Sequence, residues 1–339
     1  MNITIIGTGY VGLVSGACFA DIGNKVTCLD IDQTRISNLN KGELPFYEPG
    51  LEELIKNNSK KENLCFTSSY KEALSSSDVI FICVGTPEST SGATDLSYIE
   101  TVVDKISEII KDKDRRIIVF IKSTVPSGTC TKIQRKFNLI LKQSASEVIV
   151  ASNPEFLKEG AALDDFMHPD RIIIGTDSEE VKQIGIAIYR PINWKSNRLK
   201  IVSINSAEII KYASNAFLAT KISFMNEISR LCDSVGADVS EVRIGVGLDT
   251  RINPNFLYSG MGFGGSCFPK DIKSLKNSFE ENNLESKILQ SVLEVNETQR
   301  DFFLSKFYKF YEGKDLDQLV ISIWGLSFKP ETDDIRESI

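Results

Sequence analysis

The sequence contains a single histidine and has no long apolar run, no paired cysteines and no excess of positive charge. Because no apolar stretch approaches the roughly 18 residues that cross a bilayer, we expect no membrane-spanning helix and no membrane partner. The chain opens directly on the apolar residues 2–6, without the basic and long apolar segments of a signal peptide, which predicts a cytoplasmic protein. The seven cysteines lack paired or metal-ligand spacing, so we expect neither disulfides nor a metal site.

Negative charge exceeds positive charge in this chain of 339 residues. The net charge of -7 argues against a general affinity for nucleic acid, but it leaves room for a small phosphorylated ligand in a local basic pocket. The length exceeds the about 250 to 300 residues of a single core, so we expect at least two domains. His168 stands before Pro169 at the entry of a predicted strand, which favours a structural role over a catalytic one.

A glycine motif opens the fold. The residues Gly7-Thr8-Gly9-Tyr10-Val11-Gly12 lie between a predicted strand at 2–6 and a helix at 13–22, and a second strand at 25–29 ends at Asp30. In such a βαβ unit the first glycine permits a tight turn, the second lets the backbone approach a diphosphate, and the third packs the helix on the sheet. The sequence therefore predicts a dinucleotide-binding domain.

The residues after the second strand indicate which dinucleotide is bound. A carboxylate at the position of Asp30 accepts hydrogen bonds from the adenosine ribose hydroxyls, which selects NAD. Arg35 lies five residues later and either stacks on adenine or pairs with a 2′-phosphate, so NADP remains the alternative.

Strands and helices continue to alternate after this unit, which predicts a doubly wound parallel sheet. Two strand ends carry polar turn residues, and we expect Thr86 and Thr124 to face the cofactor there, with turn capping as the alternative. The further strands are predicted at 64–67, 78–84, 117–122, 147–151 and 172–174, and the helices between them at 49–58, 97–110 and 127–141.

The exit of the strand at 147–151 is rich in charge. Glu155 and Glu159 are four residues apart, so we expect them to share one face of a short helical turn and to orient a water or accept a proton. Lys158 between them is a candidate for a phosphate contact. The alternative is a solvated loop.

A helix of about thirty residues is predicted at 206–235, with Ser206 and Glu208 capping its start. Lys211 and Asn215 share one stripe of this otherwise apolar helix, where a buried ammonium stabilises an oxyanion and an amide positions a hydroxyl or a water. The alternative is a hydrated helix face. A helix of this length between domains also predicts a homodimer.

The stretch Gly262–Asp271 has a thiol at its centre. Three glycines permit positive φ or a close approach to a ligand, and Pro269 suits the first turn of a helix, so Cys267 is predicted to lie exposed at a helix N-terminus. Unpaired N–H groups and Lys270 there favour a thiolate nucleophile. The alternative is a buried structural cysteine. The glycine-rich residues 245–265 before it have the composition of a substrate-binding loop.

The remaining residues predict helices at 271–282 and 286–311, then a strand at 319–324 and the start of a helix at 332–338. The expected fold is α/β, with an N-terminal Rossmann-like doubly wound sheet, a central all-helical domain with a long spine helix, and the beginning of a truncated C-terminal α/β domain. The expected domains are 1–204 for NAD, 205–312 for dimerisation and catalysis, and 313–339 for the start of the third.

Taken together, six motifs resemble the UDP-glucose/GDP-mannose dehydrogenase family along the whole chain. The resemblance implies oxidation of the C6 alcohol of a nucleotide sugar to a carboxylate with two NAD molecules, through an aldehyde that a cysteine captures as a thiohemiacetal and then a thioester. The motifs are Gly7–Gly12, Ser123–Pro126, Asn153–Phe156, Ala207–Asn215, Gly262–Asp271, and Phe328–Pro330 with Arg336–Ser338.

The resemblance assigns roles residue by residue. The catalytic set is the nucleophile Cys267, the oxyanion stabiliser Lys211, the base or water-positioning Asp271, Glu155 for thioester hydrolysis, and Thr124 and Asn215 for holding water and oxyanion. The resemblance adds Glu159, Lys270 and Arg336 to the cofactor contacts already expected from the glycine motif and the strand ends. The full set of expected cofactor contacts is Gly7, Gly9, Tyr10, Val11, Gly12, Asp30, Arg35, Thr86, Thr124, Glu159, Lys270 and Arg336. The substrate contacts are Glu155, Phe156, Leu157, Lys158, Glu159, Lys211, Asn215, Arg251, Phe256, Tyr258, Gly260 and Gly264.

Two further features, the C-terminal end of the chain and the residue after Cys267, bear on the comparison with the family. The resemblance implies a C-terminal domain that closes over the nucleotide end of the substrate, and we expect the residues up to Ile339 to hold only its beginning. Phe268 after the expected nucleophile resembles the branch that oxidises UDP-glucose. The alternatives are a GDP-mannose or UDP-N-acetylhexosamine dehydrogenase, a two-electron hydroxyacid dehydrogenase, or a binding module without catalysis.

Overall fold

The computed structural model describes residues 1–89, 92–193 and 197–339 of the chain. These residues form two compact units, Met1–Lys211 and Tyr212–Ile339, called the first and the second unit below. The three domains predicted from the sequence stay a prediction. None of the helices in the described residues is both long enough and apolar enough to cross a membrane.

The first unit is built on one mostly parallel sheet of eight strands, in the order β3-β2-β1-β4-β5-β6-β7-β8. All neighbouring strands are parallel except β6 and β7, which meet antiparallel at the residue pair Ser152 and Gly175. The predicted doubly wound sheet is therefore confirmed. The strands are β1 (Asn2–Ile6), β2 (Lys25–Leu29), β3 (Leu64–Thr67), β4 (Val79–Ile82), β5 (Arg116–Ile121), β6 (Glu147–Ser152), β7 (Ile172–Gly175) and β8 (Leu199–Val202).

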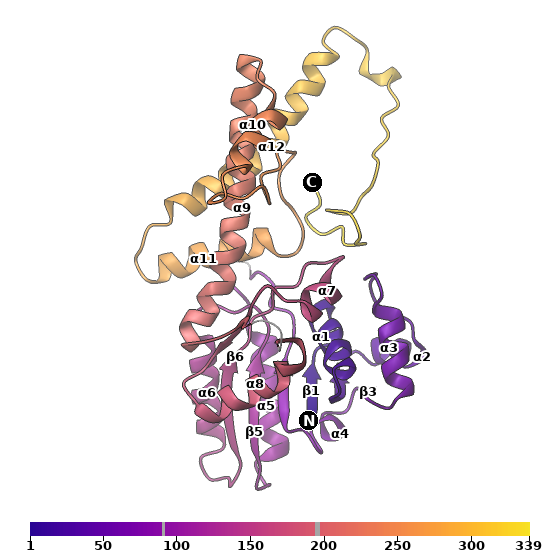
Figure 1. Cartoon of the computed structure of the whole chain (residues 1–339), viewed down its shortest axis with the longest axis vertical. Helices are drawn as coiled ribbons and strands as arrows, with labels where there is room; N and C mark the ends of the chain where they lie inside the picture. The colour runs from indigo at the N-terminus through magenta and orange to yellow at the C-terminus, as the bar shows by residue number, and fades with distance from the viewer. Residues whose placement is uncertain (90–91, 194–196) are drawn as a thin grey trace. The chain divides into compact units, whose positions relative to one another are not determined.

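Helices cover both faces of this sheet (Figure 1). For this reason the central strands are apolar without alternation, and all four residues of β4 are buried. One core lies between the sheet and α1, α3, α7 and α8, and the other lies between the sheet and α5 and α6. The helices are α1 (Tyr10–Asp21), α2 (Gln33–Lys41), α3 (Leu51–Lys60), α4 (Tyr70–Ala73), α5 (Ser97–Ile110), α6 (Thr129–Ile140), α7 (Ala162–Met167) and α8 (Glu179–Asn193).

The long helix α9 (Ile204–Val235) begins two residues before its predicted start at Ser206 and leads into the second unit. The predicted caps are wrong. Ser203 Oγ accepts the hydrogen bond from the backbone N–H of Ser206, whereas the Glu208 carboxylate accepts from Gly128 N and Cys130 N at the start of α6. A carboxylate inside one helix thus compensates the unpaired N–H groups of another.

The second unit is helical. Besides the greater part of α9 it contains α10 (Val239–Gly247), α11 (Phe268–Glu281), α12 (Lys287–Phe310) and a short 3-10 helix at Leu316–Gln318. Its core is formed by apolar residues of α9, α11 and α12 and of the loop before α11, namely Ala216, Ala219, Phe263, Ile272, Leu289 and Val292. The predicted helices at 271–282 and 286–311 are confirmed with small shifts at their ends.

The predicted strand at 319–324 and the predicted helix at 332–338 are both wrong. Residues 319–324 have no regular structure, and residues 332–338 are irregular apart from a turn at 336–337. An apolar segment becomes a strand only when a neighbouring strand satisfies its backbone groups, and none of the described strands pairs with this segment. Its side chains are accordingly open to solvent, with Val320 94% and Trp324 104% exposed.

Candidate functional site

The glycine motif forms a tight turn between β1 and α1. Gly7 has φ of +98°, and a Cβ on Gly12 would lie 1.9 Å from the carbonyl oxygen of Gly7, so a side chain at Gly12 is excluded. At Gly9, by contrast, no described heavy atom lies within 4 Å of the position that a Cβ would take. The turn therefore leaves open the backbone at the N-terminus of α1, where a diphosphate fits.

Asp30 lies at the end of β2 beside this turn. Its Oδ2 accepts hydrogen bonds from Thr8 N and Thr8 Oγ1, both at 2.8 Å, and from Arg35 Nη1 at 3.0 Å. Burial raises the pKa of Asp30, but the hydrogen bonds from Thr8 and Asp32 and the charge of Arg35 together hold it below its ordinary value. Asp30 is thus an ionised carboxylate, and Arg35 is its ion-pair partner.

We expect replacement of Asp30 by alanine to lower the preference for NAD over NADP at least about tenfold, because the ribose hydroxyls lose a charged acceptor. The measurement is kcat/KM for each cofactor. Asp32→Ala is the matched control, since Asp32 caps α2 through Arg35 N and its loss should lower stability without changing the cofactor ratio. An unchanged ratio in Asp30→Ala would remove Asp30 from cofactor selection.

The two polar strand ends meet in the first unit. Thr86 is buried, and its Oγ1 donates to the backbone oxygen of Thr124 at 3.0 Å, while Ser123 Oγ donates to Val84 O at 2.6 Å. Thr86 therefore has a turn-stabilising role at the carboxyl ends of β4 and β5, and Thr124 remains half-buried beside it. Contact of either hydroxyl with the cofactor stays a prediction.

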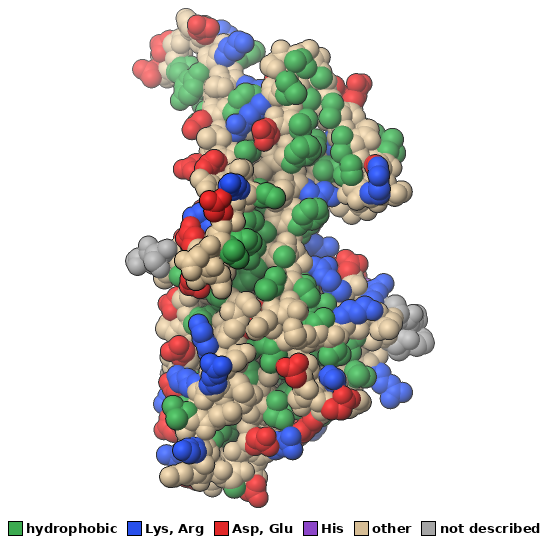
Figure 2. All heavy atoms as spheres, turned by 90° about the vertical axis from the view of Figure 1, so that its left-hand side faces the viewer, with side chains coloured by type: hydrophobic (Ala, Val, Ile, Leu, Met, Phe, Trp, Pro, Cys, Tyr) green, Lys and Arg blue, Asp and Glu red, His purple; other side chains and the backbone are tan. Residues whose placement is uncertain are grey.

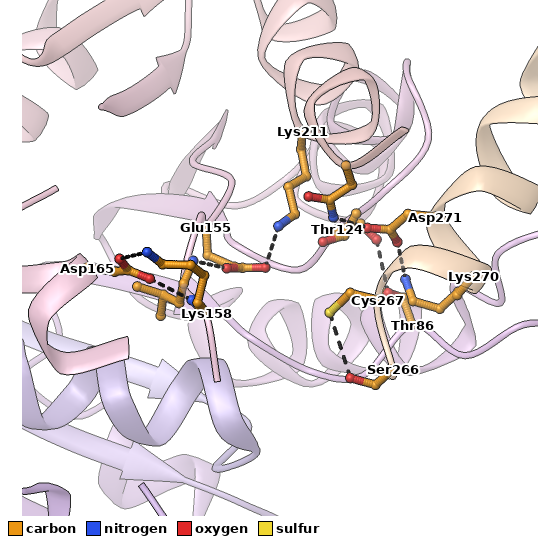
Figure 3. A network of polar contacts seen from close by, with 12 residues as sticks. Thr86, Thr124, Glu155, Lys158, Asp165, Lys211, Ser266, Cys267, Lys270 and Asp271 are labelled. Atoms are coloured by element: carbon orange, nitrogen blue, oxygen red, sulfur yellow. Dashed lines mark hydrogen bonds and ion pairs between the residues drawn. The ribbon is translucent and has the colours of Figure 1, made fainter. Parts of the chain in front are cut away.

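Glu155 and Lys211 form a buried ion pair, with Oε1 and Nζ 2.8 Å apart and side-chain exposures of 7% and 5% (Figure 3). Glu155 Oε2 also accepts from Leu157 N at 2.6 Å. Burial raises the pKa of Glu155, but the charge and hydrogen bond of Lys211 outweigh this and lower it below the ordinary value. The Lys211 ammonium also lies 5.5 Å from the ring centre of Phe156.

The predicted helical turn that would align Glu155 with Glu159 is absent. Residues 153–158 are irregular and α7 begins only at Ala162. Glu155 points inward as a result and Glu159 is half-exposed. Lys158 forms an exposed ion pair with Asp165 at 3.0 Å (Figure 3).

Sequence reasoning missed a buried polar chain behind Glu155. Lys122 Nζ donates to Asn153 Oδ1 at 3.3 Å, and the Tyr189 hydroxyl donates to the same oxygen at 2.5 Å. Burial lowers the pKa of Lys122. The feature of the sequence that could have revealed this chain is Lys122, which directly follows the apolar strand β5. A lysine in such a position is rarely buried unless it has polar partners.

Asp271 organises the polar cluster of the second unit. It is buried, and it accepts from Asn215 Nδ2 at 2.6 Å and from Lys270 Nζ at 2.8 Å (Figure 3). Burial lowers the pKa of Lys270, but the Asp271 charge and hydrogen bond outweigh this and raise it. Asn215 lies one turn beyond Lys211 on α9, and both are buried, which contradicts a hydrated helix face.

Cys267 is the N-cap residue of α11, with Pro269 in the first turn. Its side chain is exposed, which confirms the predicted position and excludes the buried structural alternative. Ser266 Oγ lies 3.7 Å from its sulfur. A thiol at a helix N-terminus with a lysine in the first turn is placed for nucleophilic chemistry.

The glycines before Cys267 allow residues near the C-terminus of the chain to pack closely against them. Gly262 and Gly265 have φ of +120° and +81°. A Cβ on Gly264 would lie 1.9 Å from the backbone oxygen of Glu337, and Gly265 N donates to the backbone oxygen of Arg336 at 3.1 Å. The side chain of Arg336 pairs with Asp334. The close approach expected of a ligand is thus made by residues 336–338, and ligand contact by Gly264 stays a prediction.

The predicted substrate loop presents several of its residues to solvent. Arg251 is exposed and pairs with Asp249 at 2.6 Å, and Tyr258 is exposed with the Arg243 guanidinium 4.7 Å from its ring centre. Gly260 N donates to Asn226 Oδ1 at 2.8 Å. Phe256 has a positive φ of 63°, with its ring 6.3 Å from that of Phe268.

Two family models match most of the chain. Residues 1–193 match the NAD binding domain of the UDP-glucose/GDP-mannose dehydrogenase family, and residues 205–298 match its central domain. The open turn at Gly9 and the ionised Asp30 fit this cofactor, so the first unit binds NAD.

Individual relatives extend the agreement to the full chain. A UDP-glucose 6-dehydrogenase of Pseudomonas aeruginosa is 43% identical over 340 residues, covering 100% of this chain and 74% of the relative. One of Bacillus subtilis is 46% identical over 338 residues, covering 100% and 75%. The solved UDP-glucose dehydrogenase of Pyrobaculum islandicum has a TM-score of 0.91 at 38% identity, covering 99% and 77%. From its sequence, its fold and its site, the chain belongs to the UDP-glucose/GDP-mannose dehydrogenase family.

Proposed function

We propose that this chain oxidises the C6 alcohol of UDP-glucose to the carboxylate of UDP-glucuronate with two molecules of NAD. The observation that carries the proposal is the exposed Cys267 at the N-terminus of α11, with Asp271 and Lys270 in the turn that follows. The relatives named UDP-glucose 6-dehydrogenase support the choice of substrate. When bound, NAD accepts a hydride from C6 in each of the two oxidations.

In the first oxidation the substrate loses its hydroxyl proton and a hydride, which leaves an aldehyde at C6. We assign Asp271, or a water that it holds, to accept the proton, because this buried carboxylate is positioned by Asn215 and Lys270. Lys211 stabilises the negative charge on the oxygen of C6, since its ammonium is buried.

In the second oxidation the Cys267 thiolate adds to the aldehyde carbon and forms a C–S bond, and the oxygen of the thiohemiacetal is stabilised by Lys211 and Asn215. Loss of the second hydride from C6 produces a thioester. A water positioned by Glu155 and Thr124 then attacks this carbon, the C–S bond breaks, and the thiol is regenerated with a carboxylate. The sum consumes one alcohol, two NAD and one water and releases two NADH and three protons.

Contacts with the ligands complete the proposal. Gly7, Gly9, Gly12 and Asp30 would hold NAD, and the remaining cofactor and substrate residues implied by the family resemblance keep those roles as proposals. The segment from Glu155 to Glu159 and the loop with Arg251 and Tyr258 hold the nucleotide sugar. The cytoplasmic location expected from the sequence remains a prediction.

The proposal is tested by the yield of NADH when UDP-glucose is limiting. Two NADH for each UDP-glucose are expected, whereas a two-electron dehydrogenase produces one, and a binding module binds both ligands without any rise in absorbance. A parallel panel with GDP-mannose and a UDP-N-acetylhexosamine decides the sugar. Greater kcat/KM for either of these than for UDP-glucose would replace the proposed substrate with that nucleotide sugar.

We propose a homodimer that pairs through α9. Phe217, Phe224 and Leu231 recur every seven residues on this helix and are 66%, 52% and 57% exposed, followed by Val235 at 67%. Figure 2 shows hydrophobic side chains gathered on the surface of the second unit. An apolar stripe at heptad spacing is typical of a helix that packs against a second helix.

We expect Phe224→Glu to convert the dimer to a monomer, because a buried unpaired charge at the interface costs several kcal/mol. The measurement is the mass in solution by sedimentation equilibrium or light scattering. Leu139→Glu is the matched control, since Leu139 is a 75% exposed apolar residue on α6 of the first unit and is not part of the stripe. A dimer that persists in Phe224→Glu at micromolar concentration would contradict pairing through this stripe.

A further inference from the structure

Glu48 is a buried carboxylate that the proposed reaction does not use. It lies in the loop between α2 and α3 and is 4% exposed. Its Oε2 accepts from the Tyr10 hydroxyl at 2.5 Å and from Gly160 N at 2.7 Å, and its Oε1 accepts from Ala162 N at 2.7 Å. A single side chain thus joins α1 to a segment more than a hundred residues away along the chain.

Both ends of this bridge adjoin residues with ligand roles. Tyr10 is the first residue of α1 and follows Gly9, where the backbone is open to the cofactor. Its hydroxyl also lies 3.2 Å from the backbone oxygen of Lys158, in the segment that begins with Glu155. All these contacts lie within the first unit, in which α1 packs beside α7 (Figure 1).

The chemistry of the bridge requires a carboxylate. Glu48 faces only donors, one O–H and two N–H groups, and both of its oxygens accept. A glutamine offers one acceptor oxygen and directs its NH₂ group at another donor, so at least one buried N–H or O–H group loses its partner. Burial, followed by the hydrogen bond and charge of Glu48, raises the pKa of Tyr10, so its hydroxyl remains a donor.

We propose that Glu48 is a positioning residue that couples the NAD-binding turn to the substrate segment 155–162. A ligand that orders the turn at Gly9 also orders Tyr10, and through Glu48 it orders Gly160 and Ala162. The first ligand therefore bears the entropy cost of ordering both segments. The second ligand then binds an already ordered protein, and its affinity is higher than when it binds alone. This coupling rests on the proposed function, because it takes UDP-glucose as the ligand of that segment.

The experiment measures the affinity for NADH by calorimetry with and without saturating UDP-glucose, a pair of ligands that does not react. In the wild type we expect UDP-glucose to tighten NADH binding at least about fivefold. In Glu48→Gln the factor should fall below about two, with no comparable change in Glu52→Gln, whose carboxylate is exposed and pairs with Lys56. A residue with a merely structural role would lower the unfolding temperature and leave the coupling factor unchanged.

A second variant keeps the test decisive if Glu48→Gln does not fold. Tyr10→Phe retains the ring that packs 5.0 Å from Phe46 and leaves both backbone contacts of Glu48 intact. It removes the hydroxyl that links the NAD-binding turn to Glu48 and to the backbone oxygen of Lys158. Its coupling factor should also fall below about two. An equal factor in the wild type and Tyr10→Phe overturns the inference while NADH production upholds the proposed function. A wild type that neither binds UDP-glucose nor reduces NAD with it overturns both.

Discussion

Replacing Cys267 with serine is expected to lower uronate formation about 10³-fold or more, while the affinity for UDP-glucose remains near that of the wild type. A serine hydroxyl is a weak nucleophile without an adjacent base, so the aldehyde is not captured and the second hydride is not released. Because the side chain is exposed at the N-terminus of α11, the free energy of unfolding should change by less than about 0.5 kcal/mol. The measurement is product analysis by chromatography together with NADH yield.

A matched control is available for this thiol. Cys65 on the edge strand β3 is also exposed, with its sulfur 3.2 Å from Thr27 Oγ1, and Cys65→Ser should retain full turnover. If Cys267→Ser forms uronate at the wild-type rate, the thioester route is excluded and the remaining residues must activate water directly against the aldehyde.

Replacing Lys211 with methionine is expected to have two large and separable effects. The rate should fall about 10²- to 10³-fold, because the oxyanion loses its charged donor. Stability should fall by about 3–5 kcal/mol, because Glu155 is left as a buried carboxylate without its ion-pair partner. The measurements are kcat under saturating ligands and the free energy of unfolding in urea.

A double variant separates the two effects. In Lys211→Met with Glu155→Leu both charges are gone and apolar side chains fill their places, so most of the lost stability should return while the rate stays low. Recovery of the rate together with stability would mean that neither Lys211 nor Glu155 takes part in the chemistry and that the pair acts only on the fold.

The same pair predicts how stability depends on pH. Because Lys211 holds the pKa of Glu155 below its ordinary value of about 4.3, the pair stabilises the wild type above that pH, and this contribution is lost as pH falls through the lowered pKa. In Lys211→Met the two contributions of Lys211 are lost and burial is opposed only by the Leu157 N–H group and the Lys122 charge, so the pKa of Glu155 rises. The deficit of the variant should therefore shrink from pH 7 toward pH 4.5, and a deficit that is constant over this window would contradict the assignment.

Much of the fold could be predicted because its signals are local. The spacing of glycines in the first turn, the apolar strands that alternate with helices, and the long pattern of α9 each report on neighbouring residues, and all agree with the structure. The exposed thiol at the start of α11 was predictable for the same reason, since proline in the first turn and glycines before it act within a few residues.

The errors arose where an element depends on a distant partner. Residues 319–324 have the composition of a strand, but no described strand lies beside them to satisfy their backbone groups. Glu208 caps α6 rather than its own helix, because folding brings it beside Gly128 and Cys130, which are distant in the sequence. The same applies to residues 153–158, which form no helical turn and in which Glu155 pairs with the distant Lys211.

The sequence by itself determined the class of fold, the dinucleotide-binding turn, and the exposed thiol at the start of its helix, because these follow from periodicity and backbone preference over short spans. Only the tertiary structure decided which donor each buried carboxylate meets: Lys211 for Glu155, Asn215 for Asp271, and Tyr10 for Glu48. Between 38 and 56 residues separate the members of these pairs along the chain. The energy of a buried charge depends on the partner that folding brings beside it, and no local pattern records that partner.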